Sequence, residues 1–388
     1  MVDFFYFTEM PYPEAPELDK YPAIRLTYPN RYFNPEVGVR IYREYLDQFA
    51  WAEEVGFDGV MVNEHHNTPT CLDVSCNLSA SAITQRTRKC KILLLGNTIA
   101  LWENPVRLAE EVAMLDLFSN GRIISGFVRG IGVEHWATNL SPVVNRERFE
   151  ESHDLIVRTW TEPGPFSWEG KHFQFRYVNP WLFPLQKPHP PIWVPGIGSE
   201  ETIRWAARHG YPYVVIYSPM ELAEQLFTLY RETADKSGYA TQPHHLGYTM
   251  GCFVGDDQKA VERSYEHVMF RMRMSAKGPV QHYAPVGMSS RSVSSRYSGK
   301  SRQPSIFQMS IDELREAGGF IVGTPEVVTE RLYYVIKRLG IGHLIMEGQF
   351  SGLPHELAMR SIELLGTQVL PALRKEFGPS EASGTAIS

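Results

Sequence analysis

The feature that most limits how this chain can fold is a regular alternation of short apolar runs with segments of helical periodicity, which continues to about residue 377. Short apolar runs bounded by turn residues are typical of buried strands, and a helix between consecutive strands makes a βα unit. The predicted strands are Asp3–Thr8, Gly59–Asn63, Lys91–Thr98, Arg122–Val128, Ile192–Val194, Tyr213–Ile216, Leu246–Val254 and Gly342–Met346. Eight parallel strands with helices outside them close most economically into an α/β fold of the (β/α)8 type, the TIM barrel.

Helical periodicity occupies the segments between these strands. The predicted helices are Glu36–Val55, Pro105–Phe118, Arg146–Thr161, Ser199–His209, Glu221–Ser237, Gln258–Met274, Thr324–Leu339 and Pro354–Phe377, with a shorter helix between Cys71 and Arg86. Gly56, Gly210 and Gly340 follow three of them, as expected just past a helix end. We therefore predict a single barrel domain over residues 1–378 and a flexible tail over 379–388.

Two stretches interrupt the repeat. The segment 161–191 is rich in proline and aromatic residues, and Trp168–Phe173 predicts a small hairpin before the fifth strand. The segment 275–310, after the seventh of the main helices, is rich in serine and arginine and has no periodicity. So long a loop in a compact domain is usually a lid or an insertion without catalytic effect. We expect a mobile insertion over 275–310, and both roles stay open.

Composition excludes several classes of protein. Lys and Arg number 38 against 44 Asp and Glu, and this net charge of −6 argues against a nucleic acid or an anionic membrane as the main partner. The N-terminus lacks the pattern of a signal peptide, and no apolar run is long enough for a membrane helix. The four cysteines have no zinc-finger spacing, which favours reduced thiols. We expect a soluble, cytoplasmic protein.

Candidate catalytic residues follow the second predicted strand. Glu64-His65-His66 comes directly after that strand, and strand ends form the working face of a βα barrel. Two imidazoles and a carboxylate there suit acid–base chemistry or metal binding. The first, third and fourth strands add no histidine at their ends. A metal-dependent barrel hydrolase is therefore the weaker alternative.

Two further features suit a phosphate group. Arg129 follows the fourth strand, and the planar fork of a guanidinium can donate to two phosphate oxygens at once. After the fifth strand, a glycine turn through Gly198 leads into a helix that begins near Ser199 and Thr202. The free N–H groups of such a helix start bind anions. Ser199 capping the helix and Arg129 in a salt bridge are the structural alternatives.

Several short motifs occur in the order seen in luciferase-like flavin monooxygenases. They are Glu64-His65-His66, Asn104 to Glu110, Leu115-Asp116 with Ser119 to Arg122, Val128-Arg129-Gly130, Pro190-Pro191-Ile192, Trp205-Ala206-Ala207 and Gly323 to Glu326. Together they span nearly the whole chain. The chain therefore resembles the bacterial luciferase family.

That resemblance implies reduced FMN as cofactor and O2 as oxidant. It implies that Arg129, Ser199 and Thr202 hold the FMN phosphate and that His65 is the active-site histidine for proton transfers. It also implies a cis peptide under the flavin ring near Leu95-Gly96-Asn97. The remaining expected cofactor contacts are Glu64 and Gly198. No nicotinamide-binding glycine motif is apparent, so a separate flavin reductase would supply the reduced FMN.

The resemblance further implies a C4a-peroxyflavin that oxygenates a small organic substrate. Hydroxylation and Baeyer–Villiger or aldehyde oxidation both remain open. Aromatic side chains near predicted strand ends or in long loops favour a hydrophobic substrate. Those expected in the substrate pocket are Trp102, Trp136 and Tyr217, and further candidates in the same regions are His135, Trp181 and Phe183.

Two alternatives stay within the same superfamily. A deazaflavin-dependent oxidoreductase would transfer hydride without stabilising an oxygen adduct. A non-catalytic flavin-binding subunit should lack the active-site histidine, and His65 argues against it. A homodimer is the expected assembly.

Overall fold

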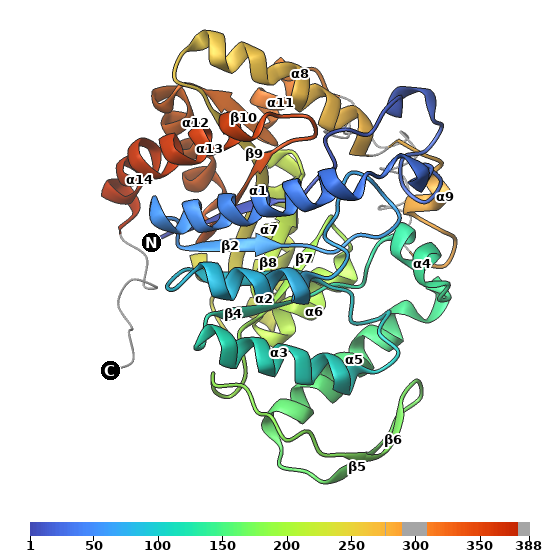
Figure 1. The fold of residues 1–388 in the computed structure, drawn as a ribbon. Helices are drawn as coiled ribbons and strands as arrows, with labels where there is room; N and C mark the ends of the chain where they lie inside the picture. The colour runs from blue at the N-terminus through green and yellow to red at the C-terminus, as the bar shows by residue number, and fades with distance from the viewer. Residues whose placement is uncertain (276, 289–308, 379–388) are drawn as a thin grey trace.

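The chain folds into a closed barrel of parallel strands wrapped by helices in this computed structural model, which describes residues 1–275, 277–288 and 309–378 (Figure 1). The barrel strands are β1 (Asp3–Thr8), β2 (Gly59–Val62), β3 (Lys91–Asn97), β4 (Ile123–Phe127), β7 (Ile192–Gly196), β8 (Tyr213–Ile216), β9 (Leu246–Val254) and β11 (His343–Gln349). Neighbouring strands pair in that order, and β11 pairs with β1 to complete the ring. The predicted (β/α)8 fold is confirmed.

Side chains alternate between two apolar layers because successive residues of a strand face opposite sides. On β1, Phe5 and Phe7 pack inside the barrel with Met61, whereas Phe4 and Tyr6 face the surrounding helices. These strands are apolar on both faces, so they appear in the sequence as continuous apolar runs.

The helices agree with prediction to within about two residues at most ends. They are α1 (Pro35–Glu54), α2 (Cys76–Arg86), α3 (Pro105–Ser119), α5 (Asn145–Thr161), α6 (Glu200–His209), α7 (Met220–Lys236), α8 (Gln258–Ser275), α12 (Pro325–Leu339), α13 (His355–Leu364) and α14 (Leu370–Phe377). The last two were predicted as one helix, and a π-helical turn over Leu365–Val369 separates them. Pro371 contributes to the break because proline has no N–H for the helical ladder.

Several short elements were not predicted. Strand β10 (Phe320–Gly323) pairs with the far end of β9, where Gly251–Val254 extends past the barrel. The short helices α4 (Gly132–Thr138) and α11 (Ile311–Ala317) have too few residues for a clear period. Of these, α4 contributes directly to the candidate site.

The two predicted interruptions have different outcomes. The hairpin is present as β5 (Phe166–Glu169) and β6 (Gln174–Val178), beside α5 at the lower edge of Figure 1. Within 275–310, a short helix α9 (Val280–Tyr283) packs against α4, so this part is not structureless. Residues 276 and 289–308 of the predicted mobile insertion, and the predicted tail over 379–388, lie outside the described residues.

Both cis peptide bonds among the described residues precede prolines, at Gly164–Pro165 and Lys187–Pro188. The cis peptide expected at Leu95–Asn97 is therefore wrong. Strand β3 instead shifts its register against β4 between Leu95 and Asn97. In the part of the chain that the structure describes, no helix has both the length and the apolarity needed to cross a membrane.

Candidate active site

A cavity of about 200 Å³ opens at the carboxyl ends of the barrel strands. In Figure 1 this is the end toward which the β2 arrow points, beside α4 and α9. Its lining side chains come from β1, β2, β3, β4, β7, β8 and β9 and from the segments that follow them. They include Glu64, His65, Leu95, Gly96, Arg129, Glu134, Ser199, Thr202, Tyr217 and Tyr283. Most sequence-predicted cofactor residues therefore share one cavity.

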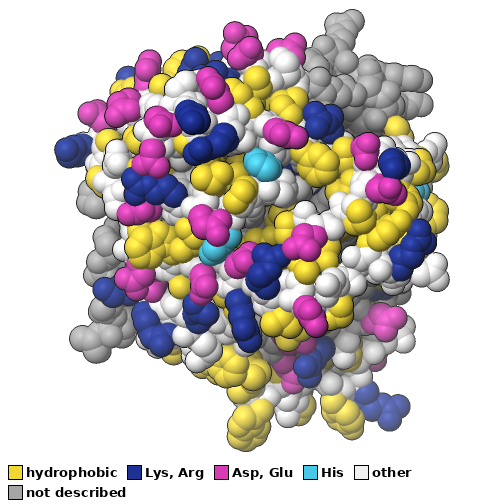
Figure 2. All heavy atoms as spheres, turned by 45° about the horizontal axis from the view of Figure 1, so that its top comes forward, with side chains coloured by type: hydrophobic (Ala, Val, Ile, Leu, Met, Phe, Trp, Pro, Cys, Tyr) yellow, Lys and Arg dark blue, Asp and Glu magenta, His cyan; other side chains and the backbone are white. Residues whose placement is uncertain are grey.

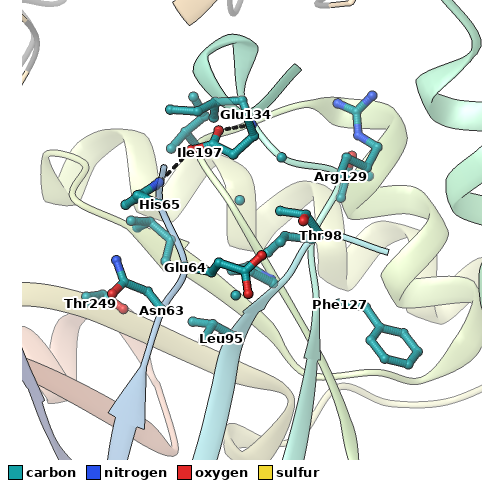
Figure 3. Close-up of a pocket in the computed structure, with 18 of the residues that line it drawn as sticks. Asn63, Glu64, His65, Leu95, Thr98, Phe127, Arg129, Glu134, Ile197 and Thr249 are labelled. Atoms are coloured by element: carbon teal, nitrogen blue, oxygen red, sulfur yellow. Dashed lines mark hydrogen bonds and ion pairs between the residues drawn. The ribbon is translucent and has the colours of Figure 1, made fainter. Parts of the chain in front are cut away.

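The end of β2 delivers His65 to this cavity. The backbone N–H of His65 donates to the Asp73 carbonyl at 3.0 Å, which fixes the main chain after the strand. Its Nδ1 lies 2.6 Å from Oε1 of Glu134, and Figure 3 shows this bond as a dashed line. Glu134 is 2% exposed and its other oxygen accepts the Ile131 N–H at 2.9 Å. Although burial raises the pKa of Glu134, His65 and Arg25 lower it below its usual range.

Glu64 lines the same cavity, but its carboxylate is partly committed to structure. Oε2 accepts the backbone N–H of Cys76 at the start of α2, where the helix dipole favours negative charge. Oε1 lies 3.4 Å from Nε2 of His66, and this hydrogen bond raises the pKa of His66. The two histidines of the motif thus pair with different carboxylates.

Two guanidinium groups lie near another part of the cavity wall. Arg129 lines the cavity, and Arg146 lines a neighbouring pocket that shares Arg129 and Ser199 with it. Arg129 follows β4, and its Nη1 lies 3.4 Å from Oδ1 of Asn145, whose amide donates to the Arg129 carbonyl. Arg146, in the first turn of α5, lies 3.5 Å from Ser199 Oγ and 3.4 Å from Thr202 Oγ1. Burial and the like charge of Arg146 lower the pKa of Arg129 to about 10, so it stays protonated at neutral pH.

The turn between β7 and α6 completes this cationic corner. Gly198 has φ +111°, a conformation that favours glycine, and the helix starts directly after Ser199. Ser199 makes no side-chain capping bond; its hydroxyl donates to Oε2 of Glu201 at 2.8 Å. Its backbone position still leaves the first N–H groups of α6 without helical partners. Ser199 thus occupies the N-cap position of α6, but its side chain makes no capping hydrogen bond.

Strand β3 supplies the closest backbone approach in the site. A Cβ on Gly96 would lie 2.6 Å from the Glu64 backbone nitrogen, so only glycine fits there. Leu95 and Gly96 line the cavity, whereas Asn97 does not. Asn97 is fully buried and donates to Oδ1 of Asn77 at 3.2 Å, so its side chain supports α2.

Beneath the cavity lies a buried network of charges. Arg271 on α8 contacts Glu347 of β11 and Glu9 after β1, each at 3.0 Å. Tyr217 donates to the same Glu347 at 2.6 Å and has φ +40°, which is strained for a non-glycine residue. Arg25 lies 3.9 Å from Glu9. This network holds the Tyr217 ring against the cavity.

A family profile for luciferase-like monooxygenases matches residues 31–343, most of the chain. The chain belongs to the luciferase-like monooxygenases. It is therefore an oxidoreductase of a flavin-dependent monooxygenase family. The resemblance read from the short motifs is confirmed.

Individual relatives are distant. The alkanal monooxygenase alpha chain of Photobacterium leiognathi is 24% identical over 343 residues, covering 86% of this chain and 95% of the relative. The oxygenase component of the flavin-dependent trigonelline monooxygenase of Acinetobacter baylyi is 27% identical over 165 residues, covering 40% of this chain and 43% of the relative. The oxygenating constituent of 3,6-diketocamphane monooxygenase of Pseudomonas putida, solved with FMN, superposes with TM-score 0.73 at 17% identity, covering 96% and 98% of the chains. That structural likeness shows the shared fold.

Several aromatic residues predicted for the substrate pocket lie elsewhere in this luciferase-like chain. Trp102 packs against the core between strands and helices, and Trp136 is 56% exposed and donates to the Gln281 carbonyl. His135 is buried and contacts Asn145. Trp181 and Phe183 are exposed in the segment after the hairpin, away from the cavity. Of the three residues assigned to the pocket, only Tyr217 lines it.

Two residues that shape the site were missed. Glu134 lies on α4, which was not predicted, and its partner His65 is 69 residues away in the sequence. Arg146 was interpreted only as part of the α5 helix. Its place four residues before Glu150 is typical of an exposed ion pair, which also forms at 3.6 Å. Among the described residues, no group of three or more His, Cys, Asp or Glu side chains is arranged to hold a metal ion.

Proposed function

We propose that this chain is the oxygenase component of a two-component system that binds reduced FMN from a separate flavin reductase and uses O2 to oxygenate a small hydrophobic compound. The observation that carries the proposal is one cavity lined by Arg129, Ser199 and Thr202 on one side and by the imidazole of His65 elsewhere on its wall. Arg146 adds a second positive charge from a neighbouring pocket, in contact with the Ser199 and Thr202 hydroxyls. One relative is named as the oxygenase component of a flavin-dependent trigonelline monooxygenase, which supports the same role for this chain.

The cationic corner fits a phosphate monoester. Within the described part of the chain, no carboxylate oxygen lies within 4.0 Å of the Arg129 guanidinium, and Arg146 lies close enough to disfavour its charge. An anion with two negative charges would relieve that repulsion and accept from both guanidinium groups. The Thr202 hydroxyl and N–H groups at the start of α6 would complete its coordination. The Ser199 hydroxyl would join them by exchanging its bond to the Glu201 carboxylate for one to the phosphate.

This corner also favours FMN over the deazaflavin alternative. FMN ends in a phosphate monoester, which carries close to two charges at neutral pH, whereas the deazaflavin phosphate is a diester with one charge. A diester would also need room for its second substituent. The fold itself does not discriminate, since an F420-dependent secondary alcohol dehydrogenase superposes with TM-score 0.67 at 17% identity, covering 96% of this chain and 99% of that one.

At the other end of the cavity, the chain provides proton control and an apolar lining. When bound, the reduced flavin would supply the electrons that activate O2. Phe7, Met61, Leu95 and Ile216 line the cavity and would exclude water from the reacting atoms. His65 is the side chain placed to accept or donate a proton there. Its presence argues against a non-catalytic subunit.

The apolar lining supports a hydrophobic substrate. For the oxygenation reaction, the proposal includes two classes of chemistry. Relatives act, by their names, on alkanals and on a diketocamphane, which are carbonyl compounds, and on trigonelline. Aldehyde or Baeyer–Villiger oxidation and hydroxylation are therefore both within the proposal.

We also propose that the protein forms a homodimer. Apolar side chains exposed along the adjacent helices α2 and α3 support this, namely Leu78, Met114, Leu117 and Phe118.

The face of the molecule drawn in Figure 2 carries acidic and basic side chains interspersed with apolar ones. No continuous basic surface is seen among the described atoms of this face.

Anaerobic titration with reduced FMN, reduced riboflavin and reduced deazaflavin F420 tests the cofactor assignment. We expect reduced FMN to bind at least tenfold more tightly than the other two, because only it offers a phosphate monoester to the corner. Equal affinity for FMN and riboflavin would contradict the phosphate site. Tighter binding of the deazaflavin would favour the hydride-transfer alternative.

A further inference from the structure

The pairing of His65 with Glu134 determines which nitrogen of the imidazole carries a proton. Glu134 is almost fully buried and its two oxygens face different donors: Oε2 accepts the Ile131 N–H at 2.9 Å, and Oε1 faces Nδ1 of His65 at 2.6 Å. An ionised carboxylate only accepts hydrogen bonds. Nδ1 must therefore be the donor.

The surroundings of Glu134 keep it ionised. Burial alone would raise its pKa, but the charge of protonated His65, the His65 hydrogen bond, Arg25 and the Ile131 N–H together bring the pKa below its usual range. When His65 is neutral, its hydrogen bond, Arg25 and the Ile131 N–H still favour the carboxylate. Of the other side chains nearby, Glu9 carries a negative charge that is balanced by Arg271 and Arg25. The local charges thus favour a carboxylate rather than a carboxylic acid at Glu134.

We propose that Glu134 is a positioning residue that holds the proton of neutral His65 on Nδ1 and leaves Nε2 as the basic nitrogen facing the cavity. This inference rests on the proposed function, in which His65 handles protons at the flavin and substrate. Histidine in water prefers the other tautomer, with the proton on Nε2. The carboxylate therefore reverses the ordinary preference.

The consequence concerns the direction of proton transfer. With Nδ1–H held by Glu134 in both protonation states, His65 can gain or lose a proton only at Nε2. Every proton that His65 accepts would come from the cavity side, and every proton it donates would return there. The hydrogen bond from the His65 backbone N–H to the Asp73 carbonyl fixes the main chain, and Glu134 fixes the ring.

His66 provides an internal contrast. It pairs with Glu64 through Nε2, at 3.4 Å, whereas His65 pairs through Nδ1. Adjacent histidines in one motif are thus expected to differ in tautomer, with His66 carrying its neutral proton on Nε2. A substitution at Glu134 should therefore change the tautomer of His65 and leave that of His66 unchanged.

The test is ¹⁵N NMR of histidine-labelled, flavin-free full-length protein, at a pH high enough for neutral imidazoles. Variants His65→Gln and His66→Gln assign the two residues. In the wild type we expect His65 to show a protonated Nδ1 and an unprotonated Nε2. Glu134→Gln offers one oxygen, which the Ile131 N–H already needs, so its amide N–H should donate to Nδ1 of His65. Nδ1 then carries no proton, and the ring proton should move to Nε2 by exchange with water. Glu134→Ala should give the same shift toward the Nε2–H tautomer.

An unchanged His65 tautomer in both variants would overturn the proposal, regardless of the results with reduced FMN. So would a His66 signal that changes as much as that of His65, because the effect would then be a general disturbance. A second measurement distinguishes failure of this proposal from failure of the proposed function. With reduced FMN and O2 in the absence of substrate, the rate of hydrogen peroxide release in Glu134→Gln should move toward that of His65→Ala. A changed tautomer with an unchanged rate would keep the role of Glu134 on the ring and reject the role of His65 at the flavin.

Discussion

Replacing Arg129 with alanine should weaken the binding of reduced FMN while leaving that of reduced riboflavin unchanged. Losing a charge-assisted contact to a phosphate costs about 1.5 to 3 kcal/mol. Since 1.4 kcal/mol corresponds to tenfold in affinity, the expected loss is about 10-fold to 150-fold. Arg146 repels Arg129 in the free protein, and a bound phosphate would relieve that repulsion. The variant loses this contribution as well as the direct contact, so the measured loss should lie toward the upper end of this range.

The assay is anaerobic fluorescence titration of both flavins with wild type, Arg129→Ala, Arg146→Ala and the double variant. Arg158→Ala is the matched control, because Arg158 lies at the other end of α5 and pairs with Glu162. It should bind both flavins as the wild type does. If Arg129→Ala weakens FMN and riboflavin equally, the residue supports the ring or the fold and the phosphate assignment is refuted.

Three further predictions follow from single residues. His65→Ala should bind reduced FMN with unchanged affinity but release hydrogen peroxide in place of oxygenated product, and unchanged coupling of O2 use to product would reject its role. Gly96→Ala should lower the free energy of unfolding by about 1 to 3 kcal/mol, because the new Cβ would meet the Glu64 backbone nitrogen at 2.6 Å; an unaltered denaturant midpoint would contradict that packing. Burial raises the pKa of Asp73 from 3.8 to about 7, so the folded state binds the extra proton and wild type should lose stability relative to Asp73→Asn as pH rises between those values. Parallel stability curves for the two proteins across that range would show that the Asp73 pKa is not raised.

The sequence was sufficient for the barrel because its strands are apolar on both faces and its helices are long and amphipathic. Strand β10 escaped prediction because it is a short apolar run after an aperiodic segment. His65 and Arg129 follow β2 and β4, and they could be placed at the working face from topology alone. This follows from the geometry of parallel strands, whose carboxyl ends share one edge.

Contacts between distant loops could not be predicted in the same way. The direction of Trp102 and Trp136 depends on how their loops pack, and that packing leaves no periodic pattern. Glu134 meets His65 only because α4 folds over the end of β2. Arg146 faces the α6 turn because of how α5 packs, not because of its position within the helix. Side-chain contacts between segments that are distant in the sequence could therefore not be predicted from the sequence alone.

Product analysis under ¹⁸O2 tests the central claim most directly. The protein would be mixed with chemically reduced FMN and a panel of ketones, aldehydes and aromatic compounds in a sealed oxygen electrode. The account predicts that O2 is consumed and that at least one compound gains a single ¹⁸O atom, with loss of this product in His65→Ala. It would be contradicted if no compound gained ¹⁸O with reduced FMN while reduced deazaflavin F420 converted a member of the same panel without O2.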